Sequence, residues 1–201
     1  MRIIGLTGGI ACGKSTISLT LRELGAVIVD GDMLSRELTA PGGAALPALR
    51  TSFGSSIFTA SGELDRRALG QLVFSDASAL RVLDDIMQPL LRDRIHQAIT
   101  DARSANADVC VLDMPLLFEK GIDVLCDRVW CAYIPHELQL ERLMARDGFT
   151  EQEAENRIAS QMPTAEKAAR ADIVIDTSGP IQYTKDCITA LYAQETGSAP
   201  R

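Results

Sequence analysis

The chain has 201 residues, of which 46% are hydrophobic, and a formal net charge of −7. This length suits one domain with its own core, and the negative charge argues against a broad nucleic-acid-binding surface. No stretch approaches the ~20 apolar residues of a membrane span and no signal peptide is recognisable. We therefore expect a cytoplasmic protein that binds neither nucleic acid nor membranes. Its five cysteines form no C-x-x-C pair, so neither a zinc site nor a disulfide framework is indicated.

The first predicted elements are a buried strand and a helix joined by a glycine-rich loop. The strand, residues 1–7, is short, apolar and β-branched. The loop, residues 8–16, reads Gly-Gly-Ile-Ala-Cys-Gly-Lys-Ser-Thr and matches the phosphate-binding pattern G-x-x-x-x-G-K-[ST]. A helix with apolar residues at helical spacing follows over residues 15–24. This order of strand, loop and helix predicts a site for a nucleoside triphosphate, and we call residues 8–16 the phosphate loop.

The chemistry of the phosphate loop follows from its backbone. Glycines allow the chain to curl so that N–H groups surround phosphate oxygens at the positive end of a helix. Lys14 can reach the outer phosphates of ATP, and the Ser15 hydroxyl can hold Mg²⁺. The residues expected to bind ATP here are Gly9, Ile10, Ala11, Cys12, Gly13, Lys14, Ser15 and Thr16.

Two carboxylates follow the second predicted strand, residues 26–30, in the sequence Asp30-Gly31-Asp32. Ligands of open α/β sheets bind beyond the carboxyl ends of the strands. An extended backbone would place Asp30 and Asp32 on one side, where one of them can accept the proton of a hydroxyl that attacks the γ-phosphate. The alternative for either residue is a turn or a helix cap.

Residues 31–107 separate this strand from the next, which is too long for a simple crossover helix. Helical patterns recur inside this segment, over residues 44–52, 65–74 and 76–103. Pro89 is expected to kink or interrupt the last of these helices. We interpret the segment as a helical insert that covers a second substrate beside Asp32. Arg36, four residues beyond Asp32, either serves that substrate or forms a surface ion pair.

Three further strands are predicted over residues 108–113, 128–133 and 171–176. The first of them ends in Asp113. An apolar strand that ends in Asp is similar to the second metal-site element of phosphate-loop enzymes, in which the carboxylate supports Mg²⁺ directly or through water. The alternative is an Asp that forms a turn.

Two helices carrying arginines follow the strand at residues 128–133. The first begins after Pro135 and places Arg142 and Arg146 on one face. The second opens with a capping box at Thr150 and Glu153. Such helices are well placed to fold over a triphosphate, where guanidinium groups neutralise the charge of the transferred phosphoryl group. Ordinary pairing with neighbouring glutamates is the alternative.

These motifs, taken in order over residues 3–179, resemble the dephospho-coenzyme A kinase family of phosphate-loop kinases. The stretches that carry the resemblance are Leu6-Thr7-Gly8-Gly9-Ile10, Val29-Asp30-Gly31-Asp32, Gly62-Glu63-Leu64-Asp65-Arg66, Val73-Phe74, Asp113-Met114-Pro115-Leu116-Leu117-Phe118-Glu119, Gln139-Leu140-Glu141-Arg142-Leu143, Arg146-Asp147, Arg157 with Gln161, and Ala171-Asp172.

The fold expected from these elements is an α/β P-loop NTPase fold, a single domain with a five-stranded parallel sheet and helices on both faces. Its core would cover about 1–34, 104–135 and 168–201, with an acceptor-binding helical insert at about 35–103 and a lid at about 136–167. The resemblance implies a kinase that transfers the γ-phosphate of ATP to the ribose 3′-hydroxyl of dephospho-CoA, the last step of CoA biosynthesis. We expect it to work as a monomer or small homo-oligomer.

The resemblance also implies roles for individual residues. Asp32 becomes the catalytic base, assisted by Lys14 and Arg142 as catalytic residues. Arg142 and Arg146 bind ATP from the lid. The acceptor-binding residues are Thr7, Asp32, Arg36 and Leu116, and the metal-binding residues are Ser15 and Asp113.

The sequence departs from the family pattern in three places. Gln88-Pro89 stands where the family often has His-Pro, Ala11-Cys12 replaces a common Gly-Ser, and the stretch after Asp176 lacks a frequent Asn. We expect the loop changes to be harmless, because the loop binds through its backbone, whereas the missing Asn leaves the adenine contacts open. Another nucleoside or nucleotide kinase is the alternative enzyme. A nucleotide-dependent switch is a second alternative, which the absence of an Asn-Lys-x-Asp motif disfavours.

Overall fold

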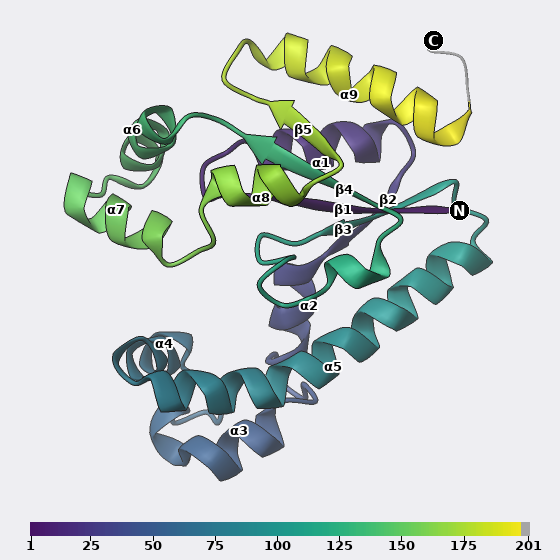
Figure 1. Cartoon of the computed structure of the whole chain (residues 1–201). Helices are drawn as coiled ribbons and strands as arrows, with labels where there is room; N and C mark the ends of the chain where they lie inside the picture. The colour runs from purple at the N-terminus through teal and green to yellow at the C-terminus, as the bar shows by residue number, and fades with distance from the viewer. Residues whose placement is uncertain (198–201) are drawn as a thin grey trace. The chain divides into compact units, whose positions relative to one another are not determined.

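The computed structural model describes residues 1–197, without the side chain of Phe74, and the chain forms two compact units (Figure 1). The first unit combines Met1–Asp30 with Thr100–Arg201, and the second is Gly31–Ile99. Residues 198–201, the end of the predicted core, lie outside the described residues. None of the helices in the described part of the chain combines the length and the hydropathy needed to cross a bilayer.

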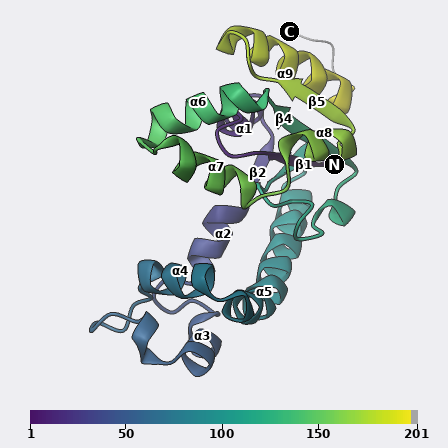
Figure 2. The ribbon, with the colours of Figure 1, turned by 60° about the vertical axis from the view of Figure 1, so that its left-hand side comes forward.

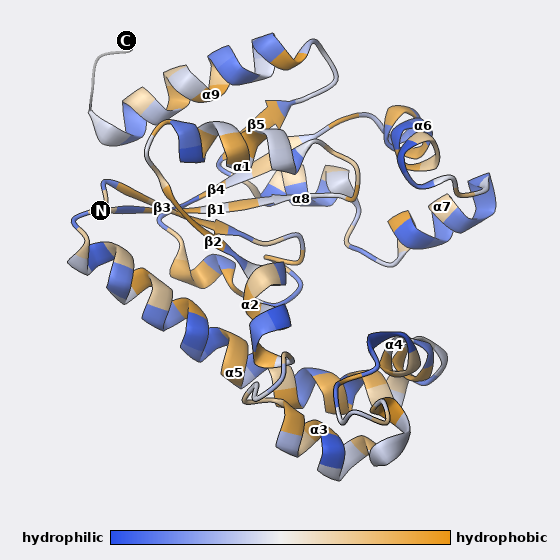
Figure 3. Cartoon of the chain, turned by 180° about the vertical axis from the view of Figure 1, so that it is seen from behind, coloured by the Kyte–Doolittle hydropathy of each residue, from blue (hydrophilic) through white to orange (hydrophobic). Residues whose placement is uncertain are grey.

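The first unit is built on a five-stranded sheet in the order β2-β3-β1-β4-β5, and all of its strand pairs are parallel. Its strands are β1 (Arg2–Gly8), β2 (Val27–Asp30), β3 (Val109–Asp113), β4 (Arg128–Tyr133) and β5 (Ile173–Asp176). Strands covered on both faces are nearly continuous apolar runs, which is why they were predictable. Figure 3 shows hydrophobic residues along these strands. The predicted parallel α/β sheet is confirmed.

The described part of the first unit contains five further helices. They are α1 (Lys14–Glu23), α6 (His136–Asp147), α7 (Glu151–Ala159), α8 (Thr164–Arg170) and α9 (Ile181–Thr196), and a 3-10 turn spans Asp123–Leu125. Of these helices, α1 and α9 lie on one face of the sheet and α8 on the other. On one face, α1 and α9 pack together over a core that includes Leu6 of β1. Successive residues of a strand point to opposite faces, so Thr7 points to the other face. There its hydroxyl and Lys167 of α8 both donate a hydrogen bond to the carbonyl of Pro115. Figure 2 shows α6 and α7 side by side and α8 following them.

The second unit is helical. It contains α2 (Gly31–Leu38), α3 (Leu46–Phe53), a 3-10 turn (Ser55–Ile57), α4 (Arg66–Ser75) and most of α5 (Ala77–Ser104), whose last residues belong to the first unit. Asp65 caps α4 by accepting hydrogen bonds from the N–H groups of Arg67 and Ala68, at 3.0 and 2.9 Å. The buried apolar residues of this second unit include Leu34, Leu38, Leu49, Ile57, Leu69 and Val73. Hydrophilic and hydrophobic residues alternate along α5 in Figure 3, as expected of an amphipathic helix.

Three expectations about elements were incomplete or wrong. The extended backbone expected from Asp30 to Asp32 is wrong, because α2 begins at Gly31 and Asp32 lies in its first turn, where a helix favours an acid. Of the kink or interruption expected at Pro89, the interruption is wrong, because α5 runs through this residue. Pro89 and Asp85, whose carbonyl loses its usual partner, are both exposed, so water can satisfy that carbonyl. The helix α8 was not predicted.

Candidate active site

The phosphate loop connects the end of β1 to the start of α1. Gly13 is the N-cap residue of α1 with a left-handed φ of 76°, and Ala11 also has a positive φ, of 60°. The first turn of a helix has N–H groups without intrahelical partners, and these groups form a site for an anion. The predicted order of strand, loop and helix is present, and the loop leads into the N-terminus of α1.

Buried side chains from other segments of the chain pack against the phosphate loop. The Thr177 hydroxyl, in the segment after β5, donates to the Cys12 carbonyl at 2.8 Å. A Cβ on Gly9 would overlap Thr164 Oγ1 and Gln139 Nε2, so no larger residue fits there. These three supporting side chains are all buried, and none of them was predicted. Thr177 lies in the stretch that lacks the frequent Asn, and the structure gives it a contact with the loop backbone.

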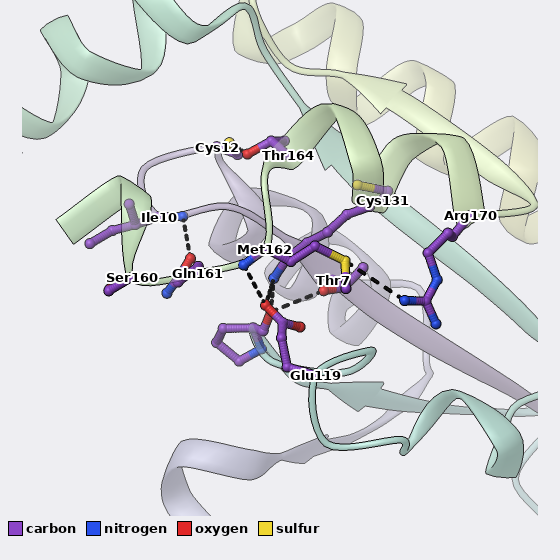
Figure 4. Close-up of polar contacts among 12 residues, drawn as sticks. Thr7, Ile10, Cys12, Glu119, Cys131, Ser160, Gln161, Met162, Thr164 and Arg170 are labelled. Carbon is purple, nitrogen blue, oxygen red and sulfur yellow. Dashed lines mark hydrogen bonds and ion pairs between the residues drawn. The ribbon is translucent and has the colours of Figure 1, made fainter. Parts of the chain in front are cut away.

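The peptide groups of Ile10 are already hydrogen-bonded within the protein. Its N–H donates to Gln161 Oε1 at 3.1 Å (Figure 4), and its carbonyl accepts from Gln139 Nε2 at 2.9 Å. Gln139 lies on α6, and Gln161 lies between α7 and α8. Both ends of the helical pair α6–α7 thus contact the same residue of the phosphate loop. Direct phosphate binding by Ile10, as predicted, would require its N–H to leave Gln161.

Lys14 and Asp113 lie together beside the phosphate loop. Lys14 Nζ forms an ion pair with Asp113 Oδ1, and only 19% and 8% of the two side chains are exposed. Asp113 ends β3 and stands in register with Leu6 of β1 on one side and with Asp30 of β2 on the other. The order of the strands therefore brings Lys14 and the carboxylates of Asp113 and Asp30 to the carboxyl end of the sheet.

The residues near this ion pair suit Mg²⁺ in the way that phosphate-loop enzymes use it. Ser15, on the first turn of α1, is exposed, and Asp113 supplies a carboxylate. Among the described residues, no group of three or more His, Cys, Asp and Glu side chains is placed to hold a metal by itself. Mg²⁺ is commonly held by one or two protein oxygens together with substrate phosphates and water, so the available oxygen ligands fit it.

The predicted acceptor residues Asp32 and Arg36 both lie on α2 in the second unit, and both are exposed. They are four residues apart in the helix, which places them on one face. Arg66 Nη2 donates to the Arg36 carbonyl at 3.3 Å, so a second arginine lies beside this end of α2.

The two predicted lid arginines have different surroundings. Arg142 Nη2 donates to the carbonyl oxygens of Thr177 and Ser178 at 3.0 and 3.4 Å. Arg146 is bonded through Nε and Nη2 to both carboxylate oxygens of Asp147, at 2.8 Å each. These hydrogen bonds raise the pKa of Arg146 and lower the pKa of Asp147. Arg142 thus lies against the segment after β5, next to the partner of Cys12, whereas Arg146 is engaged by its neighbour.

The remaining predicted acceptor residues, Thr7 and Leu116, lie at or near the segment that follows β3. The Thr7 hydroxyl donates to the Pro115 carbonyl at 3.1 Å, and Leu116 is half-buried. The same carbonyl accepts from Lys167, which is fully buried. A lysine in a polar helix normally lies at the surface, so no sequence signal marked Lys167 as buried.

All five cysteines are free thiols. Burial raises the pKa of Cys12, whose thiol lies 3.8 Å from the Thr164 hydroxyl, and raises the pKa of Cys131 to about 12. Both thiols therefore stay protonated at neutral pH, and Cys12 acts in the phosphate loop as a small buried residue.

The parallel sheet, the phosphate loop before α1, and the Asp at the end of β3 define a P-loop kinase. Comparison with known proteins narrows the class. The sequence model of dephospho-CoA kinases matches residues 2–182. A dephospho-CoA kinase of Carboxydothermus hydrogenoformans is 46% identical over 94% of this chain and 92% of its own length. The chain belongs to the dephospho-CoA kinase family, as its motifs predicted.

Two solved structures extend this likeness to three dimensions. A crystal structure from Thermus thermophilus is 33% identical, has a TM-score of 0.81, and covers 96% of this chain and 97% of its own. The structure of a dephospho-CoA kinase from Campylobacter jejuni is 26% identical, has a TM-score of 0.74, and covers 98% of this chain and 99% of its own. Family membership gives the chain an ATP-dependent dephospho-CoA kinase activity.

Proposed function

We propose that this chain transfers the γ-phosphate of ATP to the ribose 3′-hydroxyl of dephospho-CoA, with the phosphate loop as donor site and Asp32 as base. The observation that carries the proposal is the ion pair of Lys14 with Asp113 beside the first turn of α1. This pair puts the cation that would contact the outer phosphates next to the carboxylate that would support a metal ion.

On the donor side, the backbone of residues 9–16 binds the triphosphate, except for the Ile10 N–H, which stays bonded to Gln161. Lys14 contacts the outer phosphates. Ser15 and Asp113 hold Mg²⁺, which when bound neutralises charge on the phosphates. Before a triphosphate binds, Asp113 compensates the charge of Lys14, and the phosphates later take over that role. The lysine is thus kept at the edge of the sheet where its substrate arrives.

On the acceptor side, Asp32 accepts the proton of the attacking hydroxyl as that oxygen bonds to phosphorus. It lies two residues along the chain from Asp30, which ends β2. Arg36, one helical turn further along α2, contacts the acceptor together with Thr7 and Leu116. The helical insert at about 35–103 forms the rest of the acceptor site.

The lid, at about 136–167, closes over the triphosphate and excludes water. Arg142 and Arg146 approach the phosphates from α6, where a guanidinium stabilises the charge of the transferred phosphoryl group. We further infer a monomer or small homo-oligomer, which light scattering tests. The use of ATP favours a cytoplasmic location.

The test measures ADP release from ATP and Mg²⁺ with three acceptors: dephospho-CoA, CoA and adenosine. CoA is the matched control, because its 3′-oxygen already carries a phosphate. We expect fast turnover with dephospho-CoA alone and a product that is heavier by one phosphoryl group and identical to CoA. Turnover that is equally fast with CoA or with no acceptor would overturn the proposed reaction.

A further inference from the structure

A buried polar cluster in the first unit joins three segments that are far apart in the sequence. Lys167 Nζ, on α8, donates to the Pro115 carbonyl at 2.5 Å and to Glu119 Oε1 at 2.8 Å. The same oxygen of Glu119 accepts from the backbone N–H of Met162 at 3.0 Å (Figure 4). Lys167 therefore links the segment after β3 with the segment between α7 and α8.

This cluster has little freedom to rearrange. The Lys167 side chain is fully buried and that of Glu119 is 20% exposed. A buried ammonium group is stable only where acceptors surround it, and moving Glu119 away would leave Lys167 with the Pro115 carbonyl but without a counter-charge. Met162 is consequently held in place through its backbone by a carboxylate that is itself held by Lys167.

The residue before Met162 carries this constraint to the phosphate loop. Gln161 accepts the Ile10 N–H, and Gln139 donates to the Ile10 carbonyl from the other side. Gln139 is buried, and Thr164 Oγ1 lies 3.3 Å from its carboxamide oxygen. The Ile10 backbone is thus bound at both ends by the two segments from which the helical pair α6–α7 extends.

We propose that Gln161 is a positioning residue, which joins the base of the lid to the phosphate loop, and that the Lys167–Glu119 pair fixes its place. Gln161 contacts Ile10 and acts through it on the bound triphosphate. A triphosphate seated on the loop is then sensed at the base of α6 and α7, and the lid in turn holds the loop in one conformation. This inference rests on the proposed function and deepens it.

The first test replaces Gln161 with Met, which keeps the length of the side chain and removes the acceptor. The matched control is Gln152→Met on α7, because Gln152 bonds only its exposed neighbour Asn156, at 3.1 Å. Misplacement of a loop by about 1 Å can lower a rate by about 100-fold. We expect kcat of Gln161→Met to fall by about 10- to 100-fold, with KM for ATP changed by less than about threefold, and Gln152→Met to match the wild type.

The alternative is that the cluster only stabilises the fold. In that case Gln161→Met lowers the melting temperature but keeps the wild-type kcat at a temperature well below melting, and the proposal is wrong. A wild-type protein that fails to phosphorylate dephospho-CoA contradicts the proposed function instead, so the two failures are distinguishable.

The second test needs no variant, so it also holds if Gln161→Met does not fold. Amide hydrogen exchange of the wild type is measured with and without a non-hydrolysable ATP analogue. We expect the analogue to slow exchange at Ile10 and at Met162 together, since the two are linked through Gln161. Slower exchange confined to residues 8–16 would overturn the proposal.

The third test removes the anchor. Lys167→Met leaves Glu119 without its cation, and Lys185→Met, at an exposed ion pair with Glu23, is the matched control. We expect Lys167→Met to lose the analogue-dependent protection at Met162 while residues 8–16 remain protected. Retained protection at Met162 would show that Lys167 does not position this segment.

Discussion

Lys14 of the phosphate loop is paired with Asp113, the last residue of the neighbouring strand β3, in an ion pair largely removed from water. Such a pair opposes its own separation, since either charge left alone in a buried site is unfavourable. A bound triphosphate would lower the cost of separating the pair, because it would offer Lys14 a new anion. We therefore interpret the pair as a resting state, which holds the lysine where the proposed function requires it.

Two roles are proposed for the Asp113 carboxylate: it is the counter-charge of Lys14, and it supports Mg²⁺. Replacement of Asp113 by Asn separates these roles. The variant leaves Lys14 without its counter-charge, so we expect the free energy of unfolding without ligand to fall by about 2 kcal/mol. Binding of ATP without Mg²⁺ should be as tight as in the wild type or tighter, because Lys14 no longer has to leave an anion. Turnover with Mg²⁺ should fall by about 100-fold or more, since the metal ligand is lost. Calorimetric titration of ATP with and without Mg²⁺ measures the difference.

The control for Asp113→Asn is Lys14→Met, which breaks the same ion pair from the other side. It should weaken ATP binding in the presence and in the absence of Mg²⁺. If both variants weakened metal-free ATP binding equally, the resting-state interpretation would be wrong.

The acceptor base is tested by comparing Asp32→Asn with Asp30→Asn. Asn keeps the shape of either side chain but cannot take up a proton, so the variant at the true base should lose about 100- to 10,000-fold in kcat while it still binds ATP. We expect Asp32→Asn to show this loss and Asp30→Asn a smaller one. Single-turnover measurements with dephospho-CoA decide, and a larger loss in Asp30→Asn would move the base to the end of β2.

The sequence was sufficient to predict the strands and the loop between β1 and α1, because both depend on local patterns. Apolar β-branched runs gave the five strands, and the spacing of glycine and lysine gave the phosphate loop. Thr150 was predicted as a helix cap, and the structure shows its capping box with Glu153. In each case the deciding residues are neighbours in the chain.

The parts that escaped prediction depend on contacts between distant residues. The burial of Lys167 arises from acceptors at Pro115 and Glu119, and the two glutamines that hold Ile10 come from positions far along the chain. Lys167 has no local sign of burial. Gln139 and Gln161 stand in stretches that carry the family resemblance, but those stretches do not indicate that either side chain contacts Ile10. The extended backbone at Asp32 was expected because a clear strand ends at Asp30. The amphipathic spacing of Leu34 and Leu38, four residues apart, was the signal for the helix that begins at Gly31.

The lid arginines should differ in importance. Arg142 donates only to backbone carbonyls after β5, whereas Arg146 is already held by both oxygens of Asp147. A guanidinium that stabilises transition-state charge is worth about 100- to 1,000-fold in rate. We expect Arg142→Met to lose that much in kcat and Arg146→Met to lose less than about tenfold. Steady-state kinetics of both variants, each checked for unchanged melting, provides the measurement, and the reverse order would assign the main role to Arg146.

Ala11 offers a gain of stability without loss of function. Its φ of 60° lies in the left-handed region, where a Cβ is strained by about 1–2 kcal/mol. Ala11→Gly removes that strain but gives the unfolded chain more freedom, so we expect a net gain of about 0.5–1 kcal/mol in the free energy of unfolding. kcat should stay within about twofold, because the loop binds phosphate through its backbone. Ala190→Gly, in the exposed interior of α9, is the matched control and should instead destabilise by about 1 kcal/mol. Urea unfolding of both variants measures the difference, and a loss of stability in Ala11→Gly would show that the loop backbone is not strained at this residue.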